Sequence, residues 1–454
     1  MKKVKNRSLC ALLLVGLAII GMTYYIIRYA VMGGEWASAS FNTKVYSGGA
    51  LISGTLTDRN GVMLAGIKNG KRIFAENADV RKATLHVVGD LHGNIGTGAL
   101  AVYAPKLIGY NIITGAYSRT GEGKTIALTI DSKLNVAAYK ALNGRRGAVM
   151  VMNYETGEVI CMVSNPSFNP SSPPKNVESD PAYEGVYLNR AISSELTPGS
   201  VYKLVTAAAA IENISDVYDR EFECEGKLKT GHGTITCSKT HGSLNFEEAL
   251  TVSCNSVFGE LALELGADTL AKYAEKYGLS ERTEVGGITT AKGDFDKAAP
   301  DTADLAWSGI GQYNDTVCPA AMLRFVGAIA NGGKAVIMNL LKNPGFSKTF
   351  FGKESRIMRS ETSQRLGAMM DYSVHQKNIT GNFPGLEIHA KTGTAEVGGG
   401  KKSHAWFAGY ITNEGYPLAF VVVVENGGGG FAIASPIANK VLQAAISDSY
   451  TVRH

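Results

Sequence analysis

Two stretches of the sequence place a lysine three residues after a serine, the spacing at which a lysine amine could take the proton of a serine hydroxyl. In SPPK, which begins at Ser172, two prolines exclude a regular helix and with it a fixed geometry for the pair. In TPGSVYKLVTAAAA, strong helix formers predict that Ser200 and Lys203 lie one turn apart on one helix face. A helix start favours a developing oxyanion, so Ser200 is a candidate nucleophile; the alternative is an ordinary helix cap beside a solvated lysine.

Three copies of the pattern Ser-x-Asn lie beyond residue 120, and their surroundings distinguish them. Ser167 lies in a loop rich in proline and serine, and Ser243 begins a stretch, SLNFEE, that is typical of a capped helix start. The third copy, SCN, falls between the apolar helical runs FEEALTV and VFGELALEL. A short turn between two helices there could project Ser253 and Asn255 into a cleft, with Cys254 as a small buried spacer.

The pattern Lys-Thr-Gly occurs twice. Lys229 lies in a polar stretch, where a solvated turn is the simpler interpretation. Lys391 ends an apolar strand run, and the stretch KTGTAE adds the hydroxyls of Thr392 and Thr394. Gly393 between them would let another backbone approach closely. Each motif alone is weak, but Ser-x-x-Lys, Ser-x-Asn and Lys-Thr-Gly in this order form a candidate active site.

The elements that must position these motifs are predicted from periodicity. Residues 131–142 have helical spacing of apolar side chains, and residues 147–152 and 159–163 indicate two strands joined by the turn YETG. Helical patterns dominate from about residue 200 to 335, and three strands follow, in GLEIHAKTGTAE, HAWFAGYI and YPLAFVVVVENG. The run SPIANKVLQAAISDS predicts a last helix. Strands at both ends of a helical middle indicate one α+β domain, residues 121–454, whose antiparallel sheet joins distant segments.

The N-terminal residues predict a membrane anchor. Basic residues in the tail, residues 1–7, precede an uncharged apolar run from Ser8 to Ile27, long enough to cross a bilayer. The anchor is placed at residues 8–28, with the N-terminus in the cytoplasm and the remainder outside the plasma membrane. The alternative is a signal peptide cleaved after the small residues ASA at 37–39.

Charge argues against a nucleic-acid partner. The chain has 454 residues and a formal net charge of +5, but residues 1–33 hold five basic side chains and no acidic one. The exported part is therefore neutral, with 40 basic and 40 acidic residues. Residues 34–120 are rich in glycine and short strand-like runs, and they predict a small β-rich platform between the anchor and the α+β domain.

Two cysteines stand in the polar stretch ECEGKLKTGHGTITCSKTHG. In an oxidising compartment, Cys224 and Cys237 are predicted to form a disulfide. His232 and His241 in the same stretch leave a zinc site with these cysteines as an alternative, and free thiols are a third.

The ordered motifs resemble those of the class B penicillin-binding proteins, the monofunctional peptidoglycan D,D-transpeptidases. The resemblance covers nearly the whole chain, including GTLTDRNGVMLA, RGAVMVMNYETGEVICMVSNPSFNP, NRAISSELTPGSVYK, SGIGQYNDTVCPAAML and AKTGTAE. The stretch HVVGDLHGNIGTGAL most resembles the small penicillin-binding protein A group. The resemblance implies a penicillin-binding transpeptidase fold of the serine β-lactamase type, with an antiparallel sheet and a helical subdomain, and no cofactor.

The resemblance also implies roles for the motif residues. Ser200 would attack the carbonyl between two terminal D-alanines and form an acyl-enzyme, with neutral Lys203 as its base. Ser253 would relay the proton to the leaving group, and Asn255 would hold the substrate backbone and position Lys203. Lys391 would receive the terminal carboxylate.

The strand at KTGTAE would complete this implied site. The hydroxyls of Thr392 and Thr394 would join the lysine in binding the carboxylate, beside Gly393. The N–H groups of Ser200 and Thr394 would form the oxyanion hole.

The resemblance implies the partners too: stem peptides ending in D-Ala-D-Ala, β-lactam antibiotics, the membrane and a polytopic glycan polymerase. Three other functions share these features. A D,D-carboxypeptidase would use water as acceptor, an anchored β-lactamase would deacylate rapidly, and a scaffold without catalysis would only bind the polymerase. The complete motif set argues against the scaffold.

Overall fold

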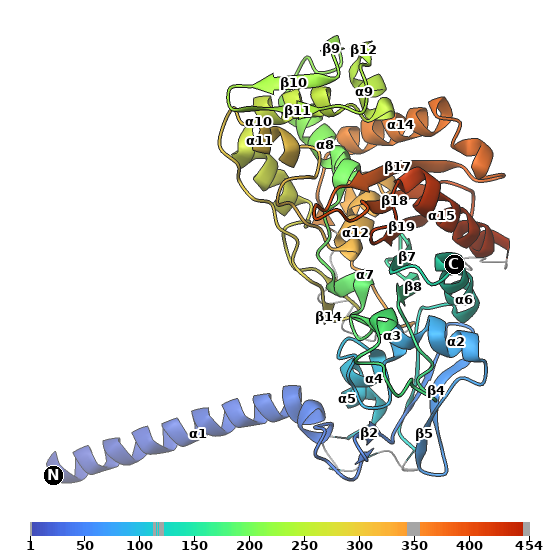
Figure 1. Ribbon diagram of the computed structural model, residues 1–454. Helices are drawn as coiled ribbons and strands as arrows, with labels where there is room; N and C mark the ends of the chain where they lie inside the picture. Colours follow the sequence, from blue (N-terminus) through green and yellow to red (C-terminus); the bar gives the residue numbers. More distant parts are fainter. Residues whose placement is uncertain (1, 112–114, 116, 118–121, 343–354, 448–454) are drawn as a thin grey trace.

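The computed structural model describes residues 2–111, 115, 117, 122–342 and 355–447 (Figure 1). Helix α1, Lys2–Ala37, projects away from the remainder of the molecule. Within the described residues it is the one helix long and apolar enough to cross a membrane, and its apolar window is not buried against other parts of the chain. The predicted anchor therefore lies within a longer helix.

The region between α1 and the α+β domain combines strands and short helices. Its main sheet has the order β5-β4-β3-β6, in which β6 runs parallel to β3. The buried guanidinium of Arg72 donates hydrogen bonds of 2.6 to 2.8 Å to the carbonyl oxygens of Leu51, Ser53 and Gly54, and so joins this sheet to the preceding loop. The elements are β1 Tyr46–Ser47, β2 Ala50–Leu51, β3 Thr55–Thr57, β4 Met63–Lys68, β5 Lys71–Phe74, β6 Thr125–Ala127, α2 Ala78–Ala83, α3 Leu85–Val88, α4 Ala99–Val102 and α5 Ala104–Leu107.

This composition differs from the predicted β-rich platform at residues 34–120. Its second half folds into α2 to α5, of which α2, α4 and α5 contain alanine, the strongest helix former. The strand β6 completes the platform sheet from residues assigned to the next domain. Residues 112–114, 116 and 118–120 of the predicted platform and residue 121 of the next domain lie outside the described residues.

A five-stranded antiparallel sheet forms the centre of the α+β domain, in the order β17-β18-β19-β7-β8. Its strands β7, β8, β18 and β19 are buried along their whole length, as the near-continuous apolar runs in their sequences require. The strands are β7 Gly147–Asn153, β8 Val159–Asn165, β17 Ile388–Ala395, β18 His404–Ile411 and β19 Leu418–Val424. The predicted pairing of strands from both ends of the domain is confirmed.

Helices cover both faces of this sheet (Figure 1). On one face, Val149 and Val151 of β7 pack in the same apolar cluster as α6, Ser132–Leu142, and α15, Gly430–Ser447. The alternating residues of β7 pack on the other face with α8, Lys203–Asn213, and α12, Pro319–Ala330. Asp131, predicted as the first residue of this helix, caps α6 instead, and the predicted end of the last helix lies outside the described residues.

The helical subdomain extends beyond one edge of the sheet (Figure 1). Its helices are α8 Lys203–Asn213, α9 Phe246–Val252, α10 Asn255–Lys276, α11 Ala303–Ser308 and α14 Ser360–Gln376. Between α8 and α9 lie two short antiparallel pairs, β9 Phe222–Cys224 with β12 Gly242–Leu244 and β10 Lys227–Thr230 with β11 Gly233–Thr236. The remaining elements are α7 Arg190–Ser193, β13 Glu284–Val285, β14 Ile288–Thr289, β15 Lys334–Ala335, β16 Ser355–Arg356 and the 3-10 turns Pro181–Tyr183, Gly199–Val201 and Thr380–Asn382.

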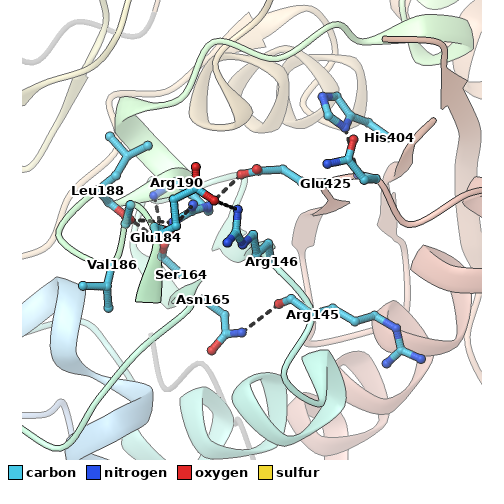
Figure 2. A network of polar contacts seen from close by, with 12 residues as sticks. Arg145, Arg146, Ser164, Asn165, Glu184, Val186, Leu188, Arg190, His404 and Glu425 are labelled. Carbon is cyan, nitrogen blue, oxygen red and sulfur yellow. Dashed lines mark hydrogen bonds and ion pairs between the residues drawn. The ribbon is translucent and has the colours of Figure 1, made fainter. Parts of the chain in front are cut away.

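A buried ion pair joins the segment that leads to Ser200 with the central sheet. Figure 2 shows Arg190, the first residue of α7, pointing toward Glu425 at the end of β19, with 2.7 Å between Nε and Oε1. The Arg190 side chain is 5% exposed and that of Glu425 is 17% exposed. Arg190 also donates to the carbonyl oxygen of Gly185 at 2.8 Å. A second pair in Figure 2, Arg146 with Glu184, lies at the surface.

Candidate active site

The predicted nucleophile lies in a tight turn at the start of α8. Ser200 is the middle residue of the 3-10 turn Gly199–Val201, and Lys203 is the first residue of α8. Hydrogen bonds to other segments hold this turn in place. Gly199 donates its N–H to the carbonyl oxygen of Gly311 at 2.8 Å. Trp406 on β18 donates its indole N–H to the carbonyl oxygen of Thr197 at 2.9 Å.

The turn and strand β17 approach each other at two glycines. A Cβ on Gly199 would lie 2.5 Å from the carbonyl oxygen of Thr394, and Gly199 also has a positive φ of 56°. A Cβ on Gly393 would lie 2.9 Å from Cγ1 of Val201. Backbone can therefore meet backbone here only because both positions lack a side chain. This confirms the close approach predicted for Gly393.

The Lys203 side chain is fully buried and points toward the turn between α9 and α10. Its Nζ lies 2.6 Å from the Ser253 carbonyl oxygen, 3.1 Å from Ser253 Oγ and 2.8 Å from Asn255 Oδ1. Among the described residues, none forms a hydrogen bond with the Ser200 hydroxyl. The structure thus brings Lys203 to the Ser-x-Asn motif and leaves the Ser200 hydroxyl without a hydrogen-bond partner among the described residues.

The Ser-x-Asn turn is built by the ends of two helices. Ser253 ends α9 in the left-handed conformation, with φ of 59°, and Asn255 begins α10. The Asn255 amide also donates to the carbonyl oxygen of Thr236 at 2.9 Å, which fixes its Oδ1 toward Lys203. As predicted from SLNFEE, Asn245 and Glu248 form a capping box at the start of α9.

The Lys-Thr-Gly motif lies on β17, at the edge of the central sheet. Lys391 is 2% exposed, and its Nζ lies 3.0 Å from Ser253 Oγ and 3.0 Å from the carbonyl oxygen of Thr392. Thr392 is partly buried, and Thr394 is exposed and accepts a hydrogen bond from the N–H of Gly430 at 3.3 Å. The three motifs therefore converge, with the Ser253 hydroxyl between two lysine amines.

Burial dominates the electrostatics of both amines. Burial lowers the pKa of Lys203 to about 7, while negative charge on the sulfurs of Cys237 and Cys254 opposes the lowering and the Lys377 ammonium adds slightly to it. Burial also holds the pKa of Lys391 well below its usual range, with Lys377 and Lys203 adding to the effect. A lysine near neutral pH can be uncharged and can take a proton from a hydroxyl.

The duplicate motifs lie elsewhere. Ser167 donates its hydroxyl to the carbonyl oxygen of Lys82, Ser243 lies on β12, and Lys229 lies on β10. Sequence reasoning did not assign Gly199, Gly311 or Trp406 to the site. Gly199 directly precedes Ser200, and Gly311 lies in the stretch SGIGQ, so both could have been singled out from the sequence. Each has a positive φ, which favours glycine. No motif marked Trp406.

The structure differs from the predicted disulfide, because Cys224 and Cys237 are free thiols. Their sulfur atoms instead form a group with the side chains of His241 and Cys254. His232 is exposed on the loop between β10 and β11 and does not belong to this group. The predicted zinc alternative therefore named His232 where the structure has Cys254, a residue interpreted as a spacer.

Known proteins resemble this chain in sequence and in fold. A sequence model of the penicillin binding protein transpeptidase domain matches residues 147–443. Peptidoglycan D,D-transpeptidase PbpA of Mycobacterium tuberculosis is 27% identical over 378 residues, which are 75% of this chain and 76% of that protein.

Two solved structures are similar over most of the chain. The ceftriaxone acyl-enzyme complex of penicillin-binding protein A from M. tuberculosis has a TM-score of 0.75 at 23% identity, covering 87% of this chain and 98% of that one. The D,D-transpeptidase domain of a peptidoglycan glycosyltransferase from Eggerthella lenta has a TM-score of 0.71 at 26% identity, covering 87% and 99%. These likenesses confirm the predicted fold class.

Proposed function

The chain belongs to the penicillin-binding protein transpeptidase family, and on that premise we propose that it cross-links peptidoglycan stem peptides as a serine D,D-transpeptidase. The observation that carries the proposal is the Ser253 hydroxyl, held 3.1 Å from Lys203 Nζ and 3.0 Å from Lys391 Nζ beside the Ser200 turn. A nucleophile, a base, a proton relay and a cationic anchor for a carboxylate are the groups that this acyl transfer needs.

The contacts of Lys203 suit a neutral amine. Two of its neighbours, the Ser253 carbonyl oxygen and Asn255 Oδ1, can only accept hydrogen bonds. They occupy the two N–H donors of a neutral amine and leave its lone pair for a hydroxyl. In the first step this lone pair takes the Ser200 proton, and Ser200 Oγ attacks the carbonyl between the terminal D-alanines.

The proton taken from Ser200 returns to the leaving group. It passes from Lys203 through the Ser253 hydroxyl to the departing D-alanine nitrogen, as the C–N bond breaks and the Ser200 ester forms. The N–H groups of Ser200 and Thr394 would stabilise the oxyanion, which the contact between the Gly199 turn and the Thr394 backbone supports. The amine of a second stem peptide then attacks the ester, and Ser200 recovers its proton.

The substrate carboxylate would bind at β17. Lys391 reaches the centre of the site, and the Thr392 and Thr394 hydroxyls lie along the same strand. A bound carboxylate would favour the protonated form of Lys391, because an opposite charge offsets the effect of burial. β-Lactams resemble the D-Ala-D-Ala end and would form the same ester with Ser200.

The N-terminal helix supports a membrane location. Lys3, Lys5 and Arg7 precede its apolar part, so we infer that the N-terminus is cytoplasmic and the catalytic domain is outside the plasma membrane. Protease added to intact spheroplasts should then remove the catalytic domain but leave an N-terminal tag protected; degradation of the tag would contradict this topology. We also infer a polytopic glycan polymerase partner, which should co-purify with the full-length protein and not with a variant in which α1 is replaced by an unrelated anchor.

Labelling with a fluorescent penicillin tests the activity. The full-length protein in detergent should form a long-lived adduct that is absent in Ser200→Ala, with Ser172→Ala as a control that keeps it. A D-Ala-D-Ala stem peptide should release D-alanine, and an added acceptor amine should appear in a cross-linked product.

Other outcomes would point to the competing functions. Release of D-alanine without cross-linked product would indicate a carboxypeptidase, and loss of the penicillin adduct within seconds would indicate a β-lactamase. No adduct on a folded protein would overturn the assignment of Ser200 and favour a scaffold.

A further inference from the structure

A pocket of about 550 Å³ lies in the platform, where the end of helix α5 meets strand β6. Its lining includes Pro105, Lys106 and Tyr110 on one side and Lys124 and Thr125 on the other. The volume is within the range of small-ligand pockets, about 300 to 1,000 Å³. None of these residues belongs to the three catalytic motifs, so transpeptidation does not account for the pocket.

The outer end of helix α1 lies beside this pocket (Figure 1). The predicted membrane span ends at residue 28, and the hydroxyl of the next residue, Tyr29, lies 3.1 Å from the hydroxyl of Tyr110. Further along the helix, a Cβ on Gly34 would lie 3.4 Å from Cβ of Pro105. Two lining residues of the pocket therefore contact the part of α1 that follows the span.

The length of α1 beyond the span gives the depth of the pocket. A helix rises about 1.5 Å per residue, so residues 29–34 extend about 9 Å past the hydrocarbon core when the helix follows the membrane normal. The headgroup layer on each side of that core is about 5 to 7 Å thick. The pocket is therefore level with the headgroups of the outer leaflet.

Aromatic side chains on both α1 and the platform lie at this level. On α1, the rings of Tyr25 and Tyr29 have centroids 6.4 Å apart, and Trp36 follows one face of the same helix. On the platform, the ring centroids of Tyr110 and Tyr117 are 5.3 Å apart. Tyrosine and tryptophan are enriched where a protein crosses the membrane–water interface, because each combines an apolar ring with a polar group.

Two lysines give the pocket a positive charge. Lys106 and Lys124 are both exposed, and the Lys124 side chain passes Gly109, where an added Cβ would lie 3.0 Å from its Cγ. Among the described residues, neither amine has a carboxylate partner, and none that line the pocket is acidic. Two cations without an anion suit a ligand that carries negative charge.

We propose that this pocket binds the phosphate of an anionic phospholipid headgroup in the outer leaflet. Lys106 and Lys124 would contact the phosphate, since lysines close to an anionic leaflet each add to the attraction. The Thr125 hydroxyl would face the same headgroup. The proposal rests on the membrane location inferred above, and it does not rest on the transpeptidase activity.

The platform supplies a matched pair of lysines for comparison. Lys68 and Lys71 are exposed and lie opposite each other on β4 and β5. Strand β5 is at one edge of the platform sheet and β6 is at the other, so these lysines lie away from the pocket. Their substitution changes the net charge by the same amount.

Native mass spectrometry of the full-length protein in detergent tests the headgroup preference. The wild type should retain phosphatidylglycerol more tightly than phosphatidylcholine with the same acyl chains, by about 10- to 30-fold. The double variant Lys106→Gln with Lys124→Gln should lose this preference, whereas Lys68→Gln with Lys71→Gln should keep it. Equal retention of the two lipids by the wild type, or equal losses in the two double variants, would overturn the proposal.

Two further measurements locate the lipid and identify its source. In lipid nanodiscs, phosphatidylglycerol with a photoactivatable headgroup should cross-link to residues 105–110 or 124–127. Cross-links confined to α1 or to the β4–β5 hairpin would overturn the assignment of the pocket. Inorganic phosphate at millimolar concentration should not displace the lipid, because it lacks acyl chains; displacement would overturn the lipid in favour of a free anion.

The same mass spectra separate this proposal from the membrane location. Protein that keeps residues 1–39 and shows no preference for phosphatidylglycerol would overturn the headgroup site alone. Protein cleaved after residue 39 would overturn both, because nothing would then hold the pocket at a membrane. Labelling by fluorescent penicillin should be unchanged in both double variants, since neither alters a catalytic motif, and this labelling shows that they fold.

Discussion

At the scale of single residues, two buried amines beside one hydroxyl set the acid–base behaviour of the site. Lys203 and Lys391 lie within 3.1 Å of Ser253 Oγ. Two ammonium groups so close in a buried site repel each other, so at most one of the two amines is expected to carry a positive charge. Lys203 contacts the carbonyl oxygens that suit a neutral amine, while Lys391 lies where a carboxylate can bind.

The acylation rate should depend on the protonation of Lys203. Because burial lowers the pKa of Lys203 to about 7, the rate of acylation by fluorescent penicillin should rise with pH and level off above that value. As pH falls through the pKa, the amine gains a proton and ceases to act as base, so the rate should fall about tenfold per pH unit. The charged and titratable groups that act on Lys203 are Lys391, Lys377, Cys237 and Cys254. A flat profile from about pH 5.5 to about pH 9 would contradict Lys203 as the base.

At the scale of elements, the site depends on how closely β17 approaches the Ser200 turn. The turn is held on its other side by the hydrogen bond between Gly199 and Gly311 and by Trp406. The strand is fixed in register with β18, where Gly393 is opposite Trp406. A rigid turn and a rigid strand thus set the distance between the nucleophile and the binding strand.

Gly393→Ala should separate these two elements. The new Cβ would lie 2.9 Å from Val201 Cγ1 and 3.0 Å from the Pro198 carbonyl oxygen, so one element must move. We expect acylation by fluorescent penicillin to fall about 10- to 100-fold, since small displacements of reacting groups are costly. Gly96→Ala, where an added Cβ meets nothing within 4 Å, is the control. An unchanged acylation rate in Gly393→Ala would show that the close approach is not needed.

Much of this arrangement could be predicted from the sequence, because the signals were local. The apolar runs of β7, β8, β18 and β19 and the capping residue Asn245 are signals that lie within or next to their own elements. The order of the three motifs predicted candidate site residues whose side chains the structure brings together around the Ser253 hydroxyl. The position of Cys254 next to Cys224, Cys237 and His241 could not be predicted, because these three residues reach it only in the folded chain.

At the scale of the whole molecule, the α+β domain is held together by contacts between its beginning and its end. The pair of Arg190 and Glu425 joins the segment before the nucleophile to the last strand of the sheet (Figure 2). Removal of one partner from a buried pair leaves the other charge buried and unpaired. The resulting loss in the free energy of unfolding is larger than the net stabilisation that the intact pair provides.

Glu425→Gln should therefore destabilise the whole domain. With Arg190 5% exposed, we expect a loss of about 3–5 kcal/mol in the free energy of unfolding, seen as a lower Tm. Glu184→Gln, which breaks the surface pair with Arg146 in the same network, is the matched control and should shift Tm far less. Equal decreases in Tm in the two variants would show that the buried pair stabilises the domain no more than the surface pair does.

The pairing of β19 with β7 has a consequence for synthesis. Strands β7 and β8, residues 147–165, are apolar and buried, yet they complete their sheet only with residues 388–424. A ribosome makes the chain from its N-terminus, so this hairpin is synthesised long before strand β19. Until then the edge of β7 that pairs with β19 remains unpaired and apolar. Until the final strands arrive, the chain is open to aggregation and to proteases. A premature stop before residue 388 should consequently yield a degraded chain, with no partly active enzyme left behind.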